Sequence, residues 1–187
     1  MPQLCDEDTL NSLISSMTAD PEGQLKRVEM LLEEFPDDAR LHFLYGSTLI
    51  GGGRLIEGHR SLSRAVEIAP DYPIARFQLG LFQLTSGEAE SALGTFGRLD
   101  LLPDSHYLRK FVDGLRCLIR DDFPGTIDHL RQGISLNTEN EPLNRDMQMV
   151  INQCLPLIGQ TADGASESSM SEASLLLTQF SNRSKLN

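Results

Sequence analysis

An internal repeat constrains the possible folds of this chain more than any other feature of its sequence. Four kinds of position recur at one constant step of 34, namely a phenylalanine, a glycine, a large apolar residue and a small residue. They are Phe43, Phe77 and Phe111; Gly46, Gly80 and Gly114; Leu62, Phe96 and Leu130; and Gly58, Ala92 and Thr126. Four series in one register indicate stacked copies of one supersecondary unit, which bury a continuous core only together.

Each unit contains two helical patterns. In segments 75–84 and 92–99 the apolar residues lie three or four positions apart, which is the spacing of one face of an α-helix. The glycine run 51–53 falls between the two patterns of its unit, and it lacks the Lys and Ser or Thr that follow the glycines of a phosphate-binding loop. We therefore expect two helices in every unit, with these glycines in the turn between them.

Seven positions are comparable in each of three units. They are His42, Tyr45, Gly46, Leu49, Gly58, Leu62 and Pro70; Arg76, Leu79, Gly80, Gln83, Ala92, Phe96 and Pro103; and Lys110, Asp113, Gly114, Cys117, Thr126, Leu130 and Thr138. Pro103 stands one residue before the position that the step of 34 gives, and Thr138 stands where proline would. The pattern resembles the tetratricopeptide repeat, with the signature W-x2-L-G-x2-Y…A-x3-F…P, although no unit has the tryptophan and Asp113 replaces a core leucine. The resemblance implies an all-α fold, a right-handed superhelix of antiparallel helix pairs that forms a tetratricopeptide-like α-solenoid.

The repeats and their flanks divide the chain into parts. These are residues 1–38, a degenerate helix pair; 39–72, 73–106 and 107–140, the three repeats; 141–158, a capping helix; and 159–187, a tail. In the capping helix we expect Leu143, Met147, Val150 and Cys154 to form one buried stripe, because an array otherwise ends in exposed apolar surface.

The tail is rich in Ser, Thr, Gly and Asn, which is typical of disorder. Within it, segment 171–180 has Ala173, Leu176, Leu177 and Phe180 at the spacing of an amphipathic helix. Two interpretations stay open. The segment covers an apolar groove, in its own chain or across a homodimer, or the pattern is a chance feature of a disordered tail.

The charge of the chain restricts its partners. With 16 basic and 27 acidic residues, the formal net charge is −11. Nucleic acid and anionic membrane surfaces would repel such a chain. The sequence shows no signal peptide and no apolar run long enough to span a bilayer, so we expect a cytoplasmic protein. Its cysteines, Cys5, Cys117 and Cys154, have no disulfide or zinc-site spacing and are expected to be reduced apolar fillers.

Residues with catalytic potential are better explained as structural. The histidines His42, His59, His106 and His129 lack metal-ligand spacing and are expected to lie on helices, half-buried or facing solvent. Asp121 and Asp122 fall in the turn of the third unit, where aspartate binds local backbone. Cys117 stands at a core position. We therefore expect no enzyme, no metal and no cofactor.

The resemblance implies a peptide-binding groove lined by the first helices of the repeats. The lining would be Arg40, Phe43, Ser47, Ile50, Ile74, Phe77, Leu81, Leu84, Leu108, Phe111, Leu115 and Leu118. These side chains are mostly apolar, so the groove would take an apolar segment and not the charged carboxylates that some family members bind. For the phenylalanine series, packing between repeats is an equally weighted alternative.

The resulting functional hypothesis is a non-enzymatic adaptor that binds an apolar peptide or helix of a partner protein. An alternative within the same family is a cytosolic chaperone for an exported, secretion-system protein, which would also be small and acidic and shield an apolar segment. A thiol or metal sensor is a third class, supported only by scattered Cys and His residues.

Overall fold

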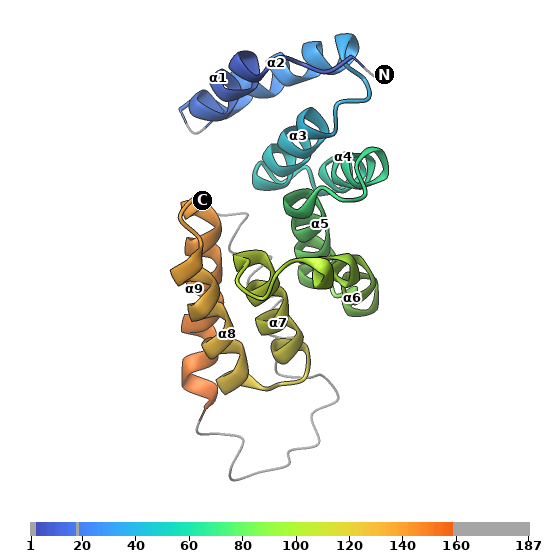
Figure 1. Cartoon of the computed structure of the whole chain (residues 1–187). Coiled ribbons are helices and arrows are strands. Elements are labelled where there is room, and N and C mark those ends of the chain that lie inside the picture. The colour runs from blue at the N-terminus through green and yellow to red at the C-terminus, as the bar shows by residue number, and fades with distance from the viewer. Residues whose placement is uncertain (1–2, 18, 159–187) are drawn as a thin grey trace. The chain divides into compact units, whose positions relative to one another are not determined.

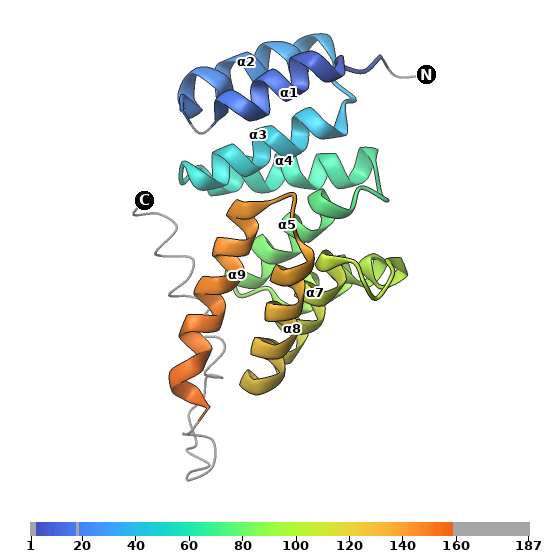
Figure 2. The ribbon, with the colours of Figure 1, turned by 60° about the vertical axis from the view of Figure 1, so that its left-hand side comes forward.

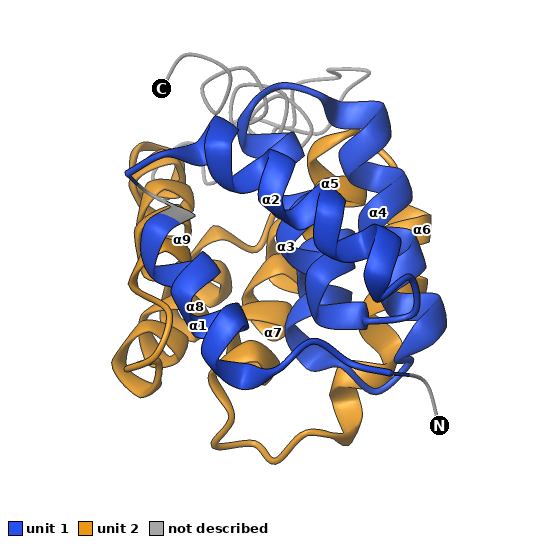
Figure 3. Ribbon diagram, turned by 90° about the horizontal axis from the view of Figure 1, so that it is seen from above, with its two compact units in different colours: residues 1–79 blue, residues 80–187 orange. Residues whose placement is uncertain are grey.

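The computed structural model describes residues 3–17 and 19–158, and this part contains helices and no strand. The predicted all-α class is therefore confirmed. The elements are α1 (Glu7–Met17), α2 (Pro21–Glu34), α3 (Ala39–Gly51), α4 (Leu55–Ile68), α5 (Pro73–Thr85), α6 (Ala89–Phe96), η1 (Gly97–Leu101), α7 (Tyr107–Ile119), α8 (Phe123–Leu136), α9 (Glu141–Cys154) and η2 (Leu155–Leu157) (Figure 1). The chain divides into two compact units, residues 1–79 and 80–187 (Figure 3).

The helices begin at a constant step along the chain. Helices α3, α5, α7 and α9 begin at residues 39, 73, 107 and 141, each 34 after the one before. Helices α2, α4, α6 and α8 begin at residues 21, 55, 89 and 123, again 34 apart. The period that we inferred from side chains therefore also sets where the backbone enters each helix.

Side-chain caps fix several of these helix starts. The side chains of Asp20, Asp38, Asp122 and Asn140 accept hydrogen bonds from backbone N–H groups in the first turns of α2, α3, α8 and α9, at 2.9–3.1 Å. Such a cap satisfies one of the N–H groups that a helix start leaves without an intrahelical partner. A proline at an early position of α2, α8 and α9 adds a preset helical φ.

A glycine marks the close approach of the two helices in each repeat. In unit 1, α3 and α4 lie side by side (Figure 2), and a Cβ added at Gly46 would lie 2.9 Å from both the Gly58 carbonyl oxygen and the Leu62 Cγ. In unit 2, a Cβ at Gly80 would lie 2.4 Å from the Phe96 ring, and one at Gly114 would lie 2.7 Å from Leu130 Cδ2. The glycine series and the large apolar series thus meet in every repeat.

The turns between paired helices repeat as well. Gly53, Gly87 and Asp121 follow one another at the repeat period and have positive φ values of 80°, 85° and 57°. Of the glycine run 51–53, only Gly53 has the expected left-handed conformation, because α3 continues through Gly51 and Gly52 has a φ of −82°. Asp121 takes the same conformation in the third repeat, which is consistent with its predicted place in a turn.

Helix α9 covers one side of α8 and presents a largely polar outer face. Its buried residues include the predicted stripe: Leu143, Met147, Val150 and Cys154, together with Ile151. The position one repeat period after Gly114 is Gln148, which is exposed, and Arg145 and Asn152 are exposed beside it. A second helix could not approach Gln148 as closely as α8 approaches Gly114 of α7, and the capping role of α9 stays a prediction. The predicted tail helix 171–180 lies outside the described residues.

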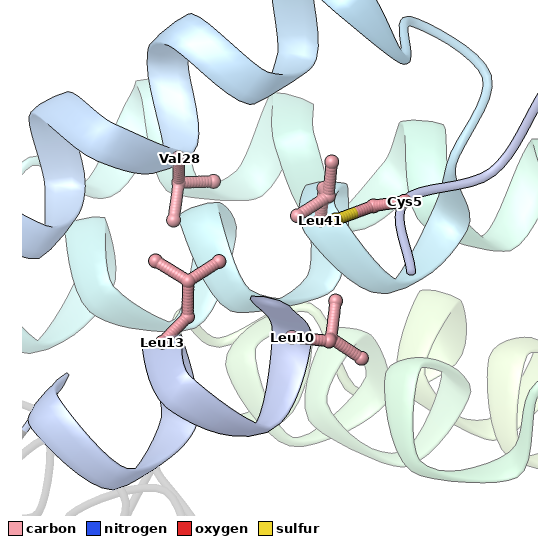
Figure 4. Close-up of a cluster of buried hydrophobic side chains, with 5 residues drawn as sticks. All are labelled: Cys5, Leu10, Leu13, Val28 and Leu41. Atoms are coloured by element: carbon pink, nitrogen blue, oxygen red, sulfur yellow. The ribbon is translucent and has the colours of Figure 1, made fainter. Parts of the chain in front are cut away.

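Helices α1 and α2 form the first pair of unit 1. Cys5, Leu10 and Leu13 pack with Val28 of α2 and Leu41 of α3 in one buried cluster (Figure 4). Leu31, Leu32, Phe35, Leu44 and Tyr45 pack around it and are partly exposed. The degenerate pair therefore joins the first complete repeat through an apolar core of its own.

Candidate functional site

The residues predicted to line the groove fall into two sets by exposure. Partly exposed are Arg40, Phe43, Ser47, Ile50 and Ile74. Buried are Phe77, Leu81, Leu84, Leu108, Phe111, Leu115 and Leu118, each with at most 7% of its surface exposed. A buried side chain offers no surface to a ligand, so the second set packs the core. The peptide-binding role stays a prediction for the first set alone.

Members of the phenylalanine series have different environments. The ring of Phe111 packs on α8, where a Cβ at Gly133 would lie 2.4 Å from it, and its centroid lies 5.8 Å from that of Tyr107. Phe43 is partly exposed, and its ring makes an edge-to-face contact with Tyr72 at 5.6 Å between centroids. Packing, the alternative to ligand contact, therefore holds for Phe111, whereas Phe43 keeps an accessible surface.

The guanidinium of Arg40 contacts the N-terminal segment of the chain. Its Nη2 donates to the Cys5 carbonyl oxygen at 2.6 Å and to Asp38 Oδ2 at 2.7 Å, and its Nη1 contacts Glu7. Burial alone would raise the pKa of the Asp38 carboxyl, but hydrogen bonds from Arg40 and from the Cys5 backbone outweigh burial and lower it. The positive charge of Arg40 is therefore already matched within the chain, and its place in a ligand groove stays a prediction.

Ser47 also differs from the expectation of a ligand-facing side chain. The residue is partly exposed, but its hydroxyl oxygen is shielded from solvent and has no hydrogen-bond partner within the described part of the chain. On α3, Phe43, Ser47 and Ile50 follow one another at helical spacing. Phe43 and Ile50 are partly exposed, and Ile50 also packs on Gly58 of α4, where an added Cβ would lie 2.6 Å from Ile50 Cγ1.

An open cavity of about 430 Å³ lies in unit 1 among α2, α3 and α4. Its lining residues are Leu32, His42, Tyr45, Glu57, Arg60, Ser61, Ser63, Arg64 and Glu67. The volume lies in the range of small-molecule sites. The sequence did not reveal this cavity, because its lining residues come from three helices and do not recur at a regular interval along the chain.

Several polar groups of this cavity already have protein partners. Ser61 Oγ donates to the His42 carbonyl oxygen at 2.9 Å, and His42 Nε2 lies 2.9 Å from the Pro36 carbonyl oxygen. Burial and a hydrogen bond to Glu29 raise the pKa of Tyr45 to about 12. Because the Ser61 proton goes to backbone, the Ser61 and His42 pair joins two helices and does not form an activated nucleophile.

The cysteines and histidines give no second site. Cys5, Cys117 and Cys154 are free and buried, and burial raises the pKa of each thiol, that of Cys154 to about 11. A raised pKa disfavours the reactive thiolate. Among the described residues no group of three His, Cys, Asp or Glu side chains could hold a metal ion. All four histidines are partly buried and lie in or next to helices, which confirms that part of the prediction.

Asp113, which departs from the repeat pattern, belongs to an ion network in unit 2. Arg116 contacts Asp100 of η1 at 2.6 Å and Asp113 at 3.6 Å, and Arg109 lies 3.8 Å from both of these carboxylates. The network connects η1 to α7. The third repeat accommodates Asp113 at the place of a core leucine because the residue is only half-buried and faces two guanidinium groups.

Comparison of the chain with models of known protein families and with curated proteins finds no match in either. None of the helices in the described ranges is both long and apolar enough to cross a lipid bilayer. The class that the fold defines is therefore an all-helical protein of repeated helix pairs.

Proposed function

We propose that this protein is a non-enzymatic adaptor of the tetratricopeptide-like α-solenoid type, which binds an apolar segment of a partner protein. The observation that supports the class is the constant step between helix starts, with a glycine at the close approach in each of three repeats. Helix pairs with this step resemble the tetratricopeptide unit, whose stacks serve as extended binding surfaces.

The proposed binding surface is narrower than the sequence predicts. It consists of Phe43 and Ile50 on α3, with Ile74 at the start of α5, all in unit 1 and partly exposed. Two aliphatic side chains and one ring suit an apolar ligand segment. The formal charge of −11 favours a partner with basic residues beside that segment, through long-range attraction.

A comparative capture experiment tests the proposal. Wild-type protein, Phe43→Ser and a matched control, Met30→Ser, are used to capture partners from the native host, followed by mass spectrometry. Met30 is 63% exposed on α2, outside the proposed surface. We expect a partner that wild type and Met30→Ser retain and Phe43→Ser loses, and its apolar segment should bind as a synthetic peptide. Identical captures by all three proteins would refute the proposed surface. An exported partner would favour the chaperone alternative.

A further inference from the structure

The N-terminal helix is anchored differently from the helices that follow it. In three repeats a glycine lets the paired helices approach closely. The position one repeat period before Gly46 is Ser12, which is exposed on α1 and marks no such approach. Helix α1 therefore depends on other contacts, and these are concentrated in segment 5–13.

Some of the contacts that hold segment 5–13 are polar and bind the backbone of Cys5. The Cys5 N–H donates to Asp38 Oδ2 at 3.0 Å, and the Cys5 carbonyl oxygen accepts from Arg40 Nη2 at 2.6 Å. Arg40 Nε donates to Asp38 Oδ1 at 3.0 Å, so the two side chains hold each other in place. Asp38 is 1% exposed. This pair binds both backbone groups of Cys5, which precedes α1, and these two hydrogen bonds do not depend on which side chain that residue carries.

Other contacts of this segment are apolar. Leu10 and Leu13 point from α1 toward Val28 of α2 and Leu41 of α3, as Figure 4 shows. Leu13 is fully buried, whereas its neighbour Ile14 is 49% exposed. One stripe of an amphipathic helix thus occupies a surface formed by two other helices, in the way that helical peptides occupy apolar grooves.

We infer that Asp38, Arg40, Val28 and Leu41 form a peptide-binding site, which segment 5–13 of the chain itself occupies and which a partner segment of the same chemistry can take over. That partner has a residue with a small apolar side chain before its helix, an acidic residue two positions later, and leucines five and eight positions later, as in Cys5, Glu7, Leu10 and Leu13. This site is distinct from the surface of Phe43 and Ile50, so the inference goes beyond the proposed function.

The connection of the segment sets how the exchange works. Three residues separate α1 from α2, so a released segment stays close to its site. Such a tether gives an effective concentration on the order of millimolar. Only molecules whose own segment is released can bind a competing peptide. The apparent affinity for the peptide is therefore the intrinsic affinity multiplied by the fraction of such molecules. A change that releases the segment should strengthen binding of the peptide.

Peptide binding to the full-length chain tests the inference. The probe is a fluorescent synthetic peptide of residues 3–17, measured by anisotropy. Leu13→Asp in the chain should release its own segment and strengthen binding by about tenfold or more relative to wild type. Ile14→Asp adds the same charge one residue away at an exposed position, and it should bind the probe as wild type does. Equal binding by all three chains would overturn the inference.

Three further measurements keep the test decisive. Arg40→Ala added to Leu13→Asp should abolish binding, and a probe carrying Leu13→Asp should not bind any of the chains. If the Leu13→Asp chain loses its helical signal, hydrogen exchange of the wild-type chain decides. Amides of α1 should exchange faster than those of α3 and α4, and excess unlabelled peptide should accelerate them further. Protection of α1 equal to that of α3, with or without peptide, would overturn the inference.

Discussion

Glycines at three equivalent positions determine how closely the helices of each repeat approach. The partner of Gly80 is the ring of Phe96, whereas Gly46 and Gly114 face the smaller Leu62 and Leu130. The largest side chain in the second-helix series thus packs directly on the bare backbone of a first helix. Interiors are close-packed, so a side chain at such a position has no space to occupy without moving the facing helix.

Replacement of Gly80 by leucine should therefore destabilise the protein far more than Gly51→Ala. We expect a loss of roughly 1–3 kcal/mol or more for Gly80→Leu, because overpacking forces side chains from their preferred rotamers. A Cβ at Gly51 would meet no atom within 4 Å, so Gly51→Ala should change stability by less than about 1 kcal/mol. Urea unfolding of both variants measures the difference, and equal losses would contradict the close approach.

Asp146 on α9 gives a second prediction at this scale, in the dependence of stability on pH. Burial raises the pKa of Asp146 to about 6, and nearby Arg145 opposes this only in part. A raised pKa in the folded state means that folding favours the protonated acid. The corresponding stability is present below the ordinary pKa of about 4 and is lost as the pH rises through about 6.

Asp146→Asn should therefore be more stable than wild type at pH 7.5, by roughly 1–2 kcal/mol, since part of the side chain still reaches solvent. The two proteins should converge below about pH 4. The matched control is Asp128→Asn, which changes an exposed aspartate on α8. Urea unfolding between pH 4 and pH 8 measures these differences. A constant offset between wild type and Asp146→Asn across this range would argue against the raised pKa.

At the scale of helices, the sequence predicts where elements begin better than which face each buries. The starts of α3, α5, α7 and α9 follow from the repeat period alone. The same 3.6-residue periodicity cannot distinguish an apolar face that packs on the paired helix from one that faces a ligand. Phe111 belongs to the first kind because Gly133 of α8 leaves space for its ring, and Gly133 lies outside the repeated glycine series.

Contacts between segments that lie far apart along the chain were the second feature of the structure that the sequence did not reveal. Arg40 was expected to face a ligand because the resemblance to the repeat family implies that it lies on the groove. Its partners are Asp38 beside it and the backbone of Cys5, which is 35 residues away. The cavity in unit 1 was missed for a similar reason, because three helices contribute to it.

Substitution of two phenylalanines of one series tests how far their environments differ. Phe77 is fully buried, so Phe77→Ser should cost roughly 3–5 kcal/mol or more through the lost contacts, the cavity and the buried hydroxyl. Phe43 is partly exposed, so Phe43→Ser should cost clearly less. Thermal melting followed by circular dichroism measures both. Similar melting temperatures for the two variants would show that Phe77 is not a core residue.

At the scale of the whole molecule, the predicted cap α9 determines whether polar or apolar surface is exposed beside α8. One side of α9 buries Leu143, Met147 and Ile151, and the other exposes Arg145 and Gln148. Because α8 packs beside α9, removal of α9 would uncover apolar surface on unit 2.

Two truncations separate the role of the cap from that of the tail. A chain ending at Asn140 should melt at a lower temperature than the full chain and bind a hydrophobic dye strongly. A chain ending at Ile158 keeps α9 and serves as the control, with unchanged melting if the tail makes no stable contact. Increased dye binding by the chain ending at Ile158 would instead support the hypothesis that segment 171–180 covers an apolar surface.

Gln148 stands 34 positions after Gly114, where a fourth glycine of the series would lie. This polar residue also limits how such a protein can gain repeats during evolution. Gln148 and its exposed neighbours Arg145 and Asn152 do not offer another helix the close glycine contact that the three repeats have. A duplicated repeat appended after α9 would find no complementary surface. The same repeat inserted between residues 140 and 141 would keep every helix start in step and leave the cap at the end. Longer relatives should therefore carry their additional repeats internally, upstream of the segment that corresponds to α9.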